Sequence, residues 1–286
     1  MSETEGKLPV SVFFITKDCG RWFERVLQPL AGFAEIVVLD SGSRDDTLEI
    51  AERHGARIYH RDFRGFGEQK QAALELCTQP WVLNLDGDEV IDDVLRDAIA
   101  RLVRLDDPSV VGGRVRIRDW FIGKLASKAT RPIRRVRLFR RERGRFLARD
   151  RVHESVQLDM AGDRVVDLSG WIEHYGVESV ALRVEKINRY STYRADQDLA
   201  RGKEPSPLKL FTIFPLRFLK SYVLRRGFLS GRRGLIQSVG SAYYALLIEA
   251  KKFETRELER SGGARSDDVS PRIRQDEPEG TQGERR

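Results

Sequence analysis

The sequence predicts an α/β fold, with a mixed and mainly parallel sheet, flanking helices and a helical region near the C-terminal end. Three observations predict this class. The first hundred residues alternate short apolar runs with helical patterns, residues 111–175 carry short alternating runs typical of partly antiparallel strands, and residues 178–253 show a helical pattern. With 286 residues, of which 40% are apolar and 9% aromatic, the chain is large enough to bury a substantial core.

The apolar runs of the first hundred residues have the length and composition of buried strands. They are rich in Val, Ile, Leu and aromatic residues and cover residues 10–16, 35–40, 56–60 and 81–85. A helix is predicted between the second and third runs, where Ser43 and Asp46 fit a capping box and Gly55 fits a C-terminal stop. A second helix is predicted over residues 68–77. Strands joined by such crossover helices indicate a parallel sheet.

Acidic residues follow two of these predicted strands. Asp40 ends the second run, and the cluster from Asp86 to Glu89 follows the fourth. Ligands of parallel sheets collect beyond the carboxyl ends of strands, so both sites are expected at one edge of the sheet. Asp86 and Asp88 flank Gly87, and such a pair can hold a divalent cation while glycine lets a bulky ligand approach. An acidic turn without a ligand has the same short pattern, so the motif depends on its context.

Basic residues gather in two later stretches. Ten arginines lie between Arg131 and Arg151, against only Glu142 and Asp150. These side chains could simply cover solvated strand faces, but as a group they attract anions. Between Lys203 and Lys252 ten Lys and Arg residues, interleaved with Phe and Tyr, face only two glutamates. This second pattern fits either an interfacial helix on an anionic membrane or an amphipathic helix packed on the first domain.

The cysteine content and the two ends of the chain bear on where the protein is expected to be located. Cys19 and Cys77 are too few for a disulfide framework and lack zinc-site spacing, which favours a reducing, intracellular compartment. The N-terminal residues lack the basic and apolar segments of a signal peptide. No run of about eighteen apolar residues predicts a spanning helix. Residues 254–286 are polar and charged, so we expect a disordered tail.

Several motifs, taken in order, resemble a known family. ITKD at 15–18, VVLDSGSRDDT at 37–47, FGEQKQAAL at 66–74 and LNLDGDE at 83–89 are similar to the nucleotide-sugar half of a family 2 glycosyltransferase of the GT-A fold. RLFRR at 137–141, RVHES at 151–155 and WIEHYG at 171–176 resemble, more narrowly, lipopolysaccharide core biosynthesis glycosyltransferases of the WaaE/KdtX type. The resemblance covers about residues 8–250. It implies a GT-A domain over 8–177, with its donor half over 8–110 and its acceptor half over 111–177, followed by the helical region.

The resemblance also implies roles for individual residues. Asp88 is expected to ligate Mg²⁺ or Mn²⁺ bridging the donor diphosphate, with Asp86 reaching the ribose or the metal. His153 is expected to be a further metal ligand or to donate a hydrogen bond to one of the metal ligands. Glu89 could orient these groups. Glu154 is the candidate catalytic base, with Asp150 as the alternative. Substrate-binding roles are implied for Thr16, Asp18, Asp40, Ser41, Lys70, Asp86 and Arg140.

These assignments predict an inverting transfer of a sugar from a nucleoside-diphosphate donor, most simply UDP. The cation would stabilise the departing diphosphate, and a carboxylate base would deprotonate the acceptor hydroxyl. The expected acceptor is an anionic envelope glycolipid or oligosaccharide such as lipopolysaccharide core, reached from the inner membrane surface. The two basic stretches would suit both acceptor and membrane.

Other classes of protein explain less of the sequence. A basic nucleic-acid-binding protein would explain the pI of about 9.5 but not the paired acids, and no nucleic acid is expected as partner. A dinucleotide oxidoreductase would need a glycine fingerprint after the first strand, where TKDCGRWF stands instead. A non-catalytic scaffold of the same fold stays open.

Overall fold

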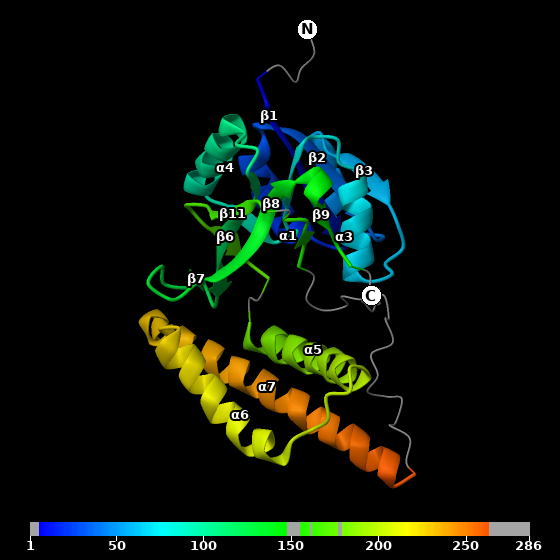
Figure 1. Cartoon of the computed structure of the whole chain (residues 1–286), viewed down its shortest axis with the longest axis vertical. Coiled ribbons are helices and arrows are strands. Elements are labelled where there is room, and N and C mark those ends of the chain that lie inside the picture. Colours follow the sequence, from blue (N-terminus) through cyan, green and yellow to red (C-terminus); the bar gives the residue numbers. More distant parts are fainter. Residues whose placement is uncertain (1–5, 148–154, 161, 177–178, 263–286) are drawn as a thin grey trace, which may run out of the picture.

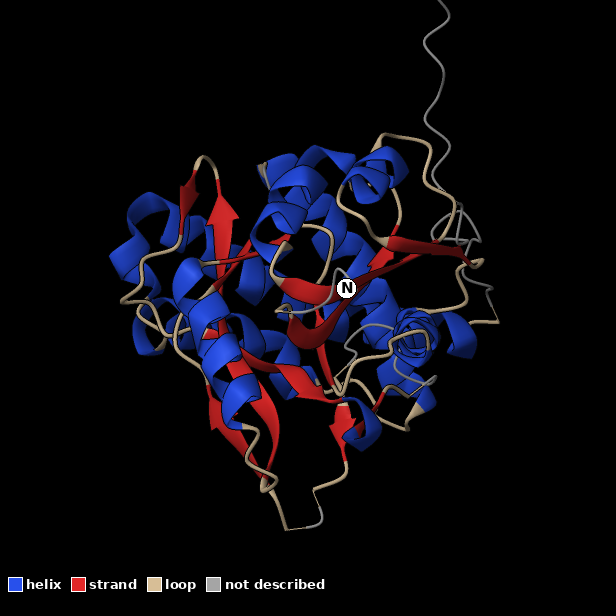
Figure 2. Ribbon diagram, turned by 90° about the horizontal axis from the view of Figure 1, so that it is seen from above, coloured by secondary structure: helices blue, strands red, loops and turns tan. Residues whose placement is uncertain are grey.

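A computed structural model of the chain describes residues 6–147, 155–160, 162–176 and 179–262. At one end lies a sheet with its helices, and at the other end α5, α6 and α7 form a separate layer (Figure 1). Viewed from above, the strands run through the middle of the molecule between helices (Figure 2). The helices of the sheet layer are α1 (Gly20–Leu27), α2 (Thr47–Arg53), α3 (Phe66–Glu75) and α4 (Asp93–Leu105), and those of the other layer are α5 (Val180–Ala200), α6 (Pro207–Leu219) and α7 (Gly231–Arg260).

The strands follow the order β3-β2-β1-β4-β8-β6-β12-β5. The first four are mutually parallel: β1 (Leu8–Thr16), β2 (Phe33–Asp40), β3 (Arg57–His60) and β4 (Trp81–Asn84). β8 (Ile133–Arg140) runs antiparallel between β4 and β6 (Val110–Phe121), while β12 (Ile172–His174) is parallel to β6 and antiparallel to β5 (Glu89–Ile91). This mixed, mainly parallel arrangement confirms the predicted fold class.

Short elements complete the chain. β7 (Lys124–Leu125) forms a hairpin with β6, and β11 (Arg164–Asp167) pairs with the start of β6. β9 (Gly144–Arg145) and β10 (Gln157–Leu158) form a separate ribbon. Single helical turns are η1 (Gln28–Leu30), η2 (Arg141–Arg143), η3 (Lys220–Leu224) and η4 (Gly227–Ser230).

Both faces of β1, β2 and β4 are buried, which explains why these strands read as unbroken apolar runs. Along β1, Val12 and Phe14 enter one core cluster, whereas Phe13 between them enters the other. The same alternation separates Val38 from Val37 on β2. Successive side chains of a strand point to opposite faces, so a strand covered on both sides must be apolar throughout.

Two predicted boundaries are wrong. α2 begins at Thr47 with Asp46 as its N-cap, and Asp46 makes no capping hydrogen bond with its side chain. The capping box fails because the Ser43 hydroxyl instead donates to the Asp40 carboxylate, 2.5 Å away. In addition, α7 continues to Arg260, beyond the predicted start of the tail at residue 254. Residues 263–286 lie outside the described part of the chain.

Candidate active site

A cleft of about 850 Å³ opens at the carboxyl ends of β1 and β4. On the sheet side it is lined by Thr16 and Asp18 after β1, by Asp86 and Asp88 after β4, and by Lys70 of α3. On the opposite side it is lined by residues of α5 and α7. Five predicted site residues therefore share one cleft. The helical layer supplies its other wall, a contribution that the sequence motifs do not indicate.

Asp40 lies behind this cleft and organises the loop after β2. Its carboxylate accepts hydrogen bonds from the Thr16 hydroxyl at 2.9 Å, from the N–H of Gly42 at 2.7 Å and from the N–H of Ser43 at 2.8 Å. Burial opposes ionisation, but these bonds and that of the Ser43 hydroxyl hold the pKa of Asp40 below its usual value. With 2% exposure and its acceptor positions occupied, Asp40 fixes the loop. The predicted contact with a base or ribose stays a prediction.

The loop after β1 is tied to the loop after β2. The N–H of Asp18 donates to the Ser43 hydroxyl at 2.9 Å, and the Asp18 carboxylate accepts from the N–H of Arg44 at 2.8 Å. Ser41, which does not line the cleft, accepts from the Gln69 amide at 3.0 Å. These bonds place the Asp18 side chain at the cleft edge with a left-handed backbone (φ 50°).

Lys70 and Arg137 surround Asp86 with positive charge. The Lys70 ammonium lies 3.1 Å from one Asp86 oxygen, and the Arg137 guanidinium lies 3.1 Å from the other. Burial disfavours the ionised form, but the two cations outweigh it and hold the pKa of the Asp86 carboxyl far below its usual value. Lys70 is therefore a buried ion-pair partner, only 3% exposed, and not a surface lysine of its helix.

Glu89 closes this network from beneath. Arg137 donates to Glu89 at 2.5 Å and to the Asn84 amide oxygen at 3.1 Å, while Glu89 accepts from the N–H of Asp86. Burial raises the pKa of Glu89, although Arg137 opposes this effect. The network thus stiffens the segment between β4 and β5 on which Asp88 stands.

Asp88 belongs to a second chain of charges that runs across the sheet. Nε2 of His174 lies 3.5 Å from the Asp88 carboxylate, and Nδ1 of the same ring lies 3.0 Å from Asp119. Burial lowers the pKa of His174, but the hydrogen bonds to the two carboxylates outweigh it, and the pKa stands well above the usual value. A Cβ at Gly176 would come within 2.3 Å of the Asp88 carboxylate, so only glycine fits beside this pair.

The donor set of this site fits a divalent cation. Mg²⁺ is commonly held by one or two carboxylates together with substrate phosphates and water. Asp88 is partly exposed at the cleft, and an imidazole stands beside it. Within the residues that the structure describes, no three His, Cys, Asp or Glu side chains form a metal-binding group. Asp88 would supply one carboxylate of such a site.

Three predicted site residues lie elsewhere or outside the described part. Arg140 is paired with Trp81 in the β4–β8 register, so it lies at the start of β4 and not at the Asp86 end. There it stacks on the Trp81 ring and donates to the carbonyl oxygens of Asp107 and Val110. The structure therefore does not support substrate binding by Arg140. His153 and Glu154, like the alternative base Asp150, fall outside the described residues.

The family resemblance assigned no role to three residues of the site, which are Arg137, His174 and Asp119. Arg137 stands in the RLFRR motif, but in an arginine-rich stretch nothing local marks it as the buried one. His174 stands in WIEHYG, and this motif was the available signal. Asp119 lies within the alternating strand β6, and no pattern in the sequence marks it.

Comparisons with known proteins agree on one family. Residues 11–156 match the family model described as Glycosyl transferase family 2. The chain is 34% identical to the lipopolysaccharide core biosynthesis glycosyltransferase LpsC of Rhizobium meliloti (strain 1021), over 88% of this chain and 94% of that protein. It is 29% identical to an uncharacterized glycosyltransferase of Rickettsia typhi (strain ATCC VR-144 / Wilmington), over 85% and 86% of the two chains.

Two of the similar solved structures hold a bound nucleotide sugar. One is the Pyrobaculum calidifontis mannosyltransferase PcManGT in complex with GDP-Man and Mn²⁺, at 17% identity and a TM-score of 0.46 over 90% of this chain and 79% of that one. Another is S. aureus TarS 1-349 in complex with UDP-GlcNAc, at 17% identity and a TM-score of 0.43 over 89% and 92%. Neither superposition supports an inference about function at such scores.

Proposed function

Because this chain belongs to glycosyl transferase family 2, we propose that it transfers a sugar from a nucleoside-diphosphate donor, with inversion, to an anionic glycolipid of the cell envelope such as lipopolysaccharide core. The family match confirms the resemblance seen in the sequence. The observation that carries the proposal is the cleft in which Asp86, Asp88, His174 and Lys70 meet at the carboxyl edge of the sheet. UDP is the nucleotide that we expect.

The residues of the cleft have complementary tasks in this proposal. A divalent cation held at Asp88, with His174 beside it, would supply Lewis-acid stabilisation of the departing diphosphate. Lys70 and Arg137 keep the Asp86 side chain ionised, so its carboxylate can accept a hydrogen bond from a ribose hydroxyl. Thr16 and Asp18 line the cleft after β1 and would contact the nucleotide.

The acceptor hydroxyl must lose a proton as it attacks the anomeric carbon from the face opposite the diphosphate. A single displacement of this kind inverts the sugar and requires one general base. Glu154 remains our candidate for the base, with Asp150 as the alternative and His153 as a further metal ligand. These three assignments come from the sequence alone.

Removal of divalent metal is expected to abolish tight donor binding. The diphosphate carries charge that Lys70 alone cannot balance, since its ammonium is already paired with Asp86. Titration calorimetry of UDP should therefore show binding with Mn²⁺ and at least about tenfold weaker binding with EDTA, with GDP as the matched control for nucleotide choice. Metal-independent UDP binding would contradict the metal role. Binding of RNA or DNA in place of UDP would favour the nucleic-acid alternative.

The helical layer presents the surface that would meet a membrane. α6 has no buried residue, and on it Leu208 and Phe211 are 73% and 80% exposed. Further exposed apolar side chains lie on the rest of α6, on η3 and η4 and at the start of α7: Leu216, Leu219, Val223, Leu224, Phe228, Leu229, Leu235 and Ile236. Figure 1 shows α6 on the outer side of this layer, away from the sheet.

Within this layer, the stretch from α6 into the first part of α7 is strongly basic. Residues 205–248 contain seven Lys and Arg and no Asp or Glu. Exposed apolar side chains among cations are the combination that binds anionic bilayer surfaces, with about 1 kcal/mol from each cation near the headgroups. No helix among the described residues has the length and apolar character to cross a membrane. We propose that this layer rests peripherally on the inner face of the cytoplasmic membrane.

The double variant Leu208→Ser/Phe211→Ser is expected to lose binding to phosphatidylglycerol vesicles. Each side chain would lose about 2 kcal/mol of burial in the bilayer, so affinity should fall more than about tenfold in a sedimentation assay. Leu105→Ser is the matched control, because Leu105 is 74% exposed at the end of α4 in the sheet layer. Equal losses in both variants, or unchanged binding in the double variant, would contradict a membrane role for α6.

A further inference from the structure

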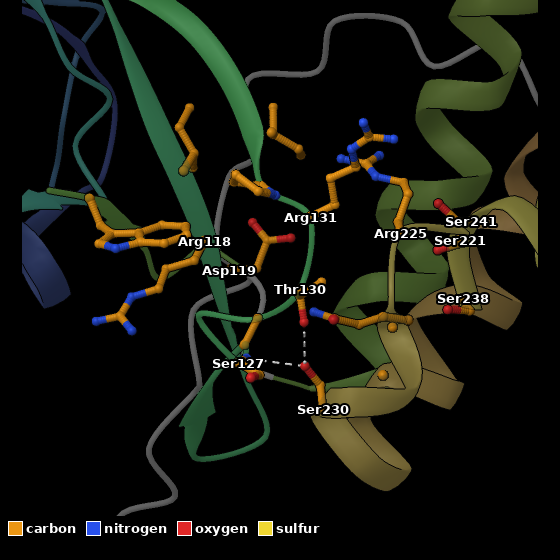
Figure 3. A pocket seen from close by; sticks show the side chains of 18 of the residues that line it. Arg118, Asp119, Ser127, Thr130, Arg131, Ser221, Arg225, Ser230, Ser238 and Ser241 are labelled. Carbon is orange, nitrogen blue, oxygen red and sulfur yellow. Dashed lines mark hydrogen bonds between the residues drawn. The ribbon is translucent and has the colours of Figure 1, made fainter. Parts of the chain in front are cut away.

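A smaller cavity of about 130 Å³ adjoins the cleft. It lies between the loop that joins β7 to β8 and the helical layer, as Figure 3 shows. Its volume exceeds the roughly 30 Å³ that one water occupies, yet falls below the roughly 300 Å³ of small drug-sized ligand pockets. A single compact group, and not a whole sugar nucleotide, would fill it. Arg183 and Ser241 line both this cavity and the cleft.

The charge of the lining is strongly positive. It contains Arg118, Arg131, Arg183 and Arg225, with Asp119 as the acid. Arg118 is ion-paired with Glu173, and Asp119 is hydrogen-bonded to His174. Among the described residues, no carboxylate lies within ion-pair distance of Arg131, Arg183 or Arg225. Asp119 interacts with Arg183 and Arg225 only beyond ion-pair distance, so three guanidinium groups stand around one cavity without a directly paired anion among the described residues.

Arg183 shows the demand for an acceptor most directly. Its Nε is buried and has no hydrogen-bond partner in the described part of the chain, while its Nη2 donates to the Gln237 carbonyl at 3.3 Å. Burial lowers the pKa of the Arg183 guanidinium, with Asp119 opposing this effect. Enclosing a cation far from a counterion is unfavourable, and an oxyanion beside this guanidinium would reduce that cost.

Hydroxyl groups and the loop geometry add neutral donors around the same space. The Ser230 hydroxyl accepts from the N–H of Ser127 at 3.1 Å and lies 3.2 Å from the Thr130 hydroxyl (Figure 3). The N–H of Arg131 donates to the Arg225 carbonyl at 2.9 Å, which joins the loop to the helical layer. Figure 3 shows the Arg131 and Arg225 side chains on the same side of the cavity. The arginines are therefore held together by backbone contacts.

We propose that this cavity is a binding site for a phosphate group, supplied by a phosphorylated sugar of the acceptor or by a lipid headgroup. Planar guanidinium groups with nearby hydroxyls match the several oxygens of a phosphate. The cavity stands between the cleft and the proposed membrane surface, so a bound phosphate would hold the acceptor next to Asp88. This link to the acceptor rests on the proposed function, whereas phosphate binding itself needs no donor.

The test is titration of the full chain with inorganic phosphate at constant ionic strength, followed by calorimetry and by the shift in melting temperature. The variant Arg131→Gln/Arg225→Gln should bind phosphate at least about tenfold more weakly than the natural chain. The matched control Arg226→Gln/Arg232→Gln removes the same charge from exposed positions of the same layer and should bind phosphate normally. Equal phosphate binding in all three proteins, or equal loss in both variants, would overturn the proposal.

Two further arms identify the source of the phosphate and separate the proposals. Competition by phosphatidylglycerol vesicles but not by a sugar phosphate would assign the site to a headgroup, and the reverse result would assign it to the acceptor sugar. UDP titration with Mn²⁺ on the same proteins reports the donor cleft independently. If the natural chain did not bind UDP, the proposed function would be wrong, but the phosphate result would still stand.

Discussion

Asp88→Asn should lower the rate of sugar transfer by about 10³-fold or more while leaving the fold intact. Asparagine keeps the size of the side chain but removes the charge that would hold the cation. Loss of metal stabilisation of a departing diphosphate is worth several kcal/mol, and about 1.4 kcal/mol corresponds to a factor of ten. The measurement is release of UDP from the donor with an acceptor fraction, together with the circular dichroism spectrum of the variant.

Asp93→Asn is the matched control for this substitution. The Asp93 side chain is 80% exposed in the first turn of α4 and does not line the cleft, so its variant should transfer sugar at the normal rate. If Asp88→Asn retained full activity with Mn²⁺, the cation would have to be held elsewhere, and the assignment of Asp88 would be wrong. A lower melting temperature of Asp88→Asn would show that the substitution disturbs the contact with His174 and not only the cation.

The parallel half of the sheet could be predicted because its signals are local. A strand covered on both faces must be apolar at consecutive positions, and β1 and β2 show this in Val12, Phe13 and Phe14 and in Val37 and Val38. The acids at the ends of β2 and β4 then meet at one edge for geometric reasons. Predicting Asp86 and Asp88 in one cleft with Thr16 and Lys70 needed only this rule and the family motifs.

The other half of the site depends on pairings that the sequence does not display. β8 brings Arg137 to Asp86, and β12 brings His174 to the cleft, because the strand order runs β4-β8-β6-β12, which is not the chain order. His174 therefore lies beside Asp88 although it stands 86 positions later in the chain. The sequence likewise does not display that the antiparallel register of β8 puts Arg140 at the start of β4, away from Asp86.

Local competition between hydrogen bonds explains the failed capping box. Ser43 has the spacing of an N-cap, but its hydroxyl is used by Asp40 and by the N–H of Asp18. Side chains of this type bond whichever backbone or side-chain group the loop presents, and tertiary contacts decide between them. The same loop that defeats the helix-start prediction ties Asp18 to the cleft edge.

Arg137→Met is expected to reduce the free energy of unfolding by about 3 kcal/mol. Removing one member of a buried ion pair leaves the other charge without compensation, which costs about 3–5 kcal/mol, and the partial exposure of Asp86 favours the lower value. The Glu89 side chain is only 3% exposed and would lose its guanidinium partner. For a chain of this size the melting temperature should fall by roughly 6–12 °C in a thermal scan.

The contrast with Arg134 makes this prediction specific to the buried network. Arg134 lies on the same strand and also pairs with a carboxylate, Asp167, but both side chains are about half exposed. Arg134→Met should therefore change stability by less than about 1 kcal/mol, as exposed ion pairs do. Equal effects of the two substitutions would show that charge on β8, and not burial, matters.

A second substitution separates loss of the cation from loss of packing. In Arg137→Met/Glu89→Gln a neutral amide replaces the buried Glu89 carboxylate, so the uncompensated charge is removed together with its partner. The double variant should regain much of the lost stability, whereas a purely steric role for Arg137 predicts that it stays as unstable as the single variant. Recovery would establish that Arg137 acts through Glu89 and Asp86, and that the segment carrying Asp88 is held in place by charge.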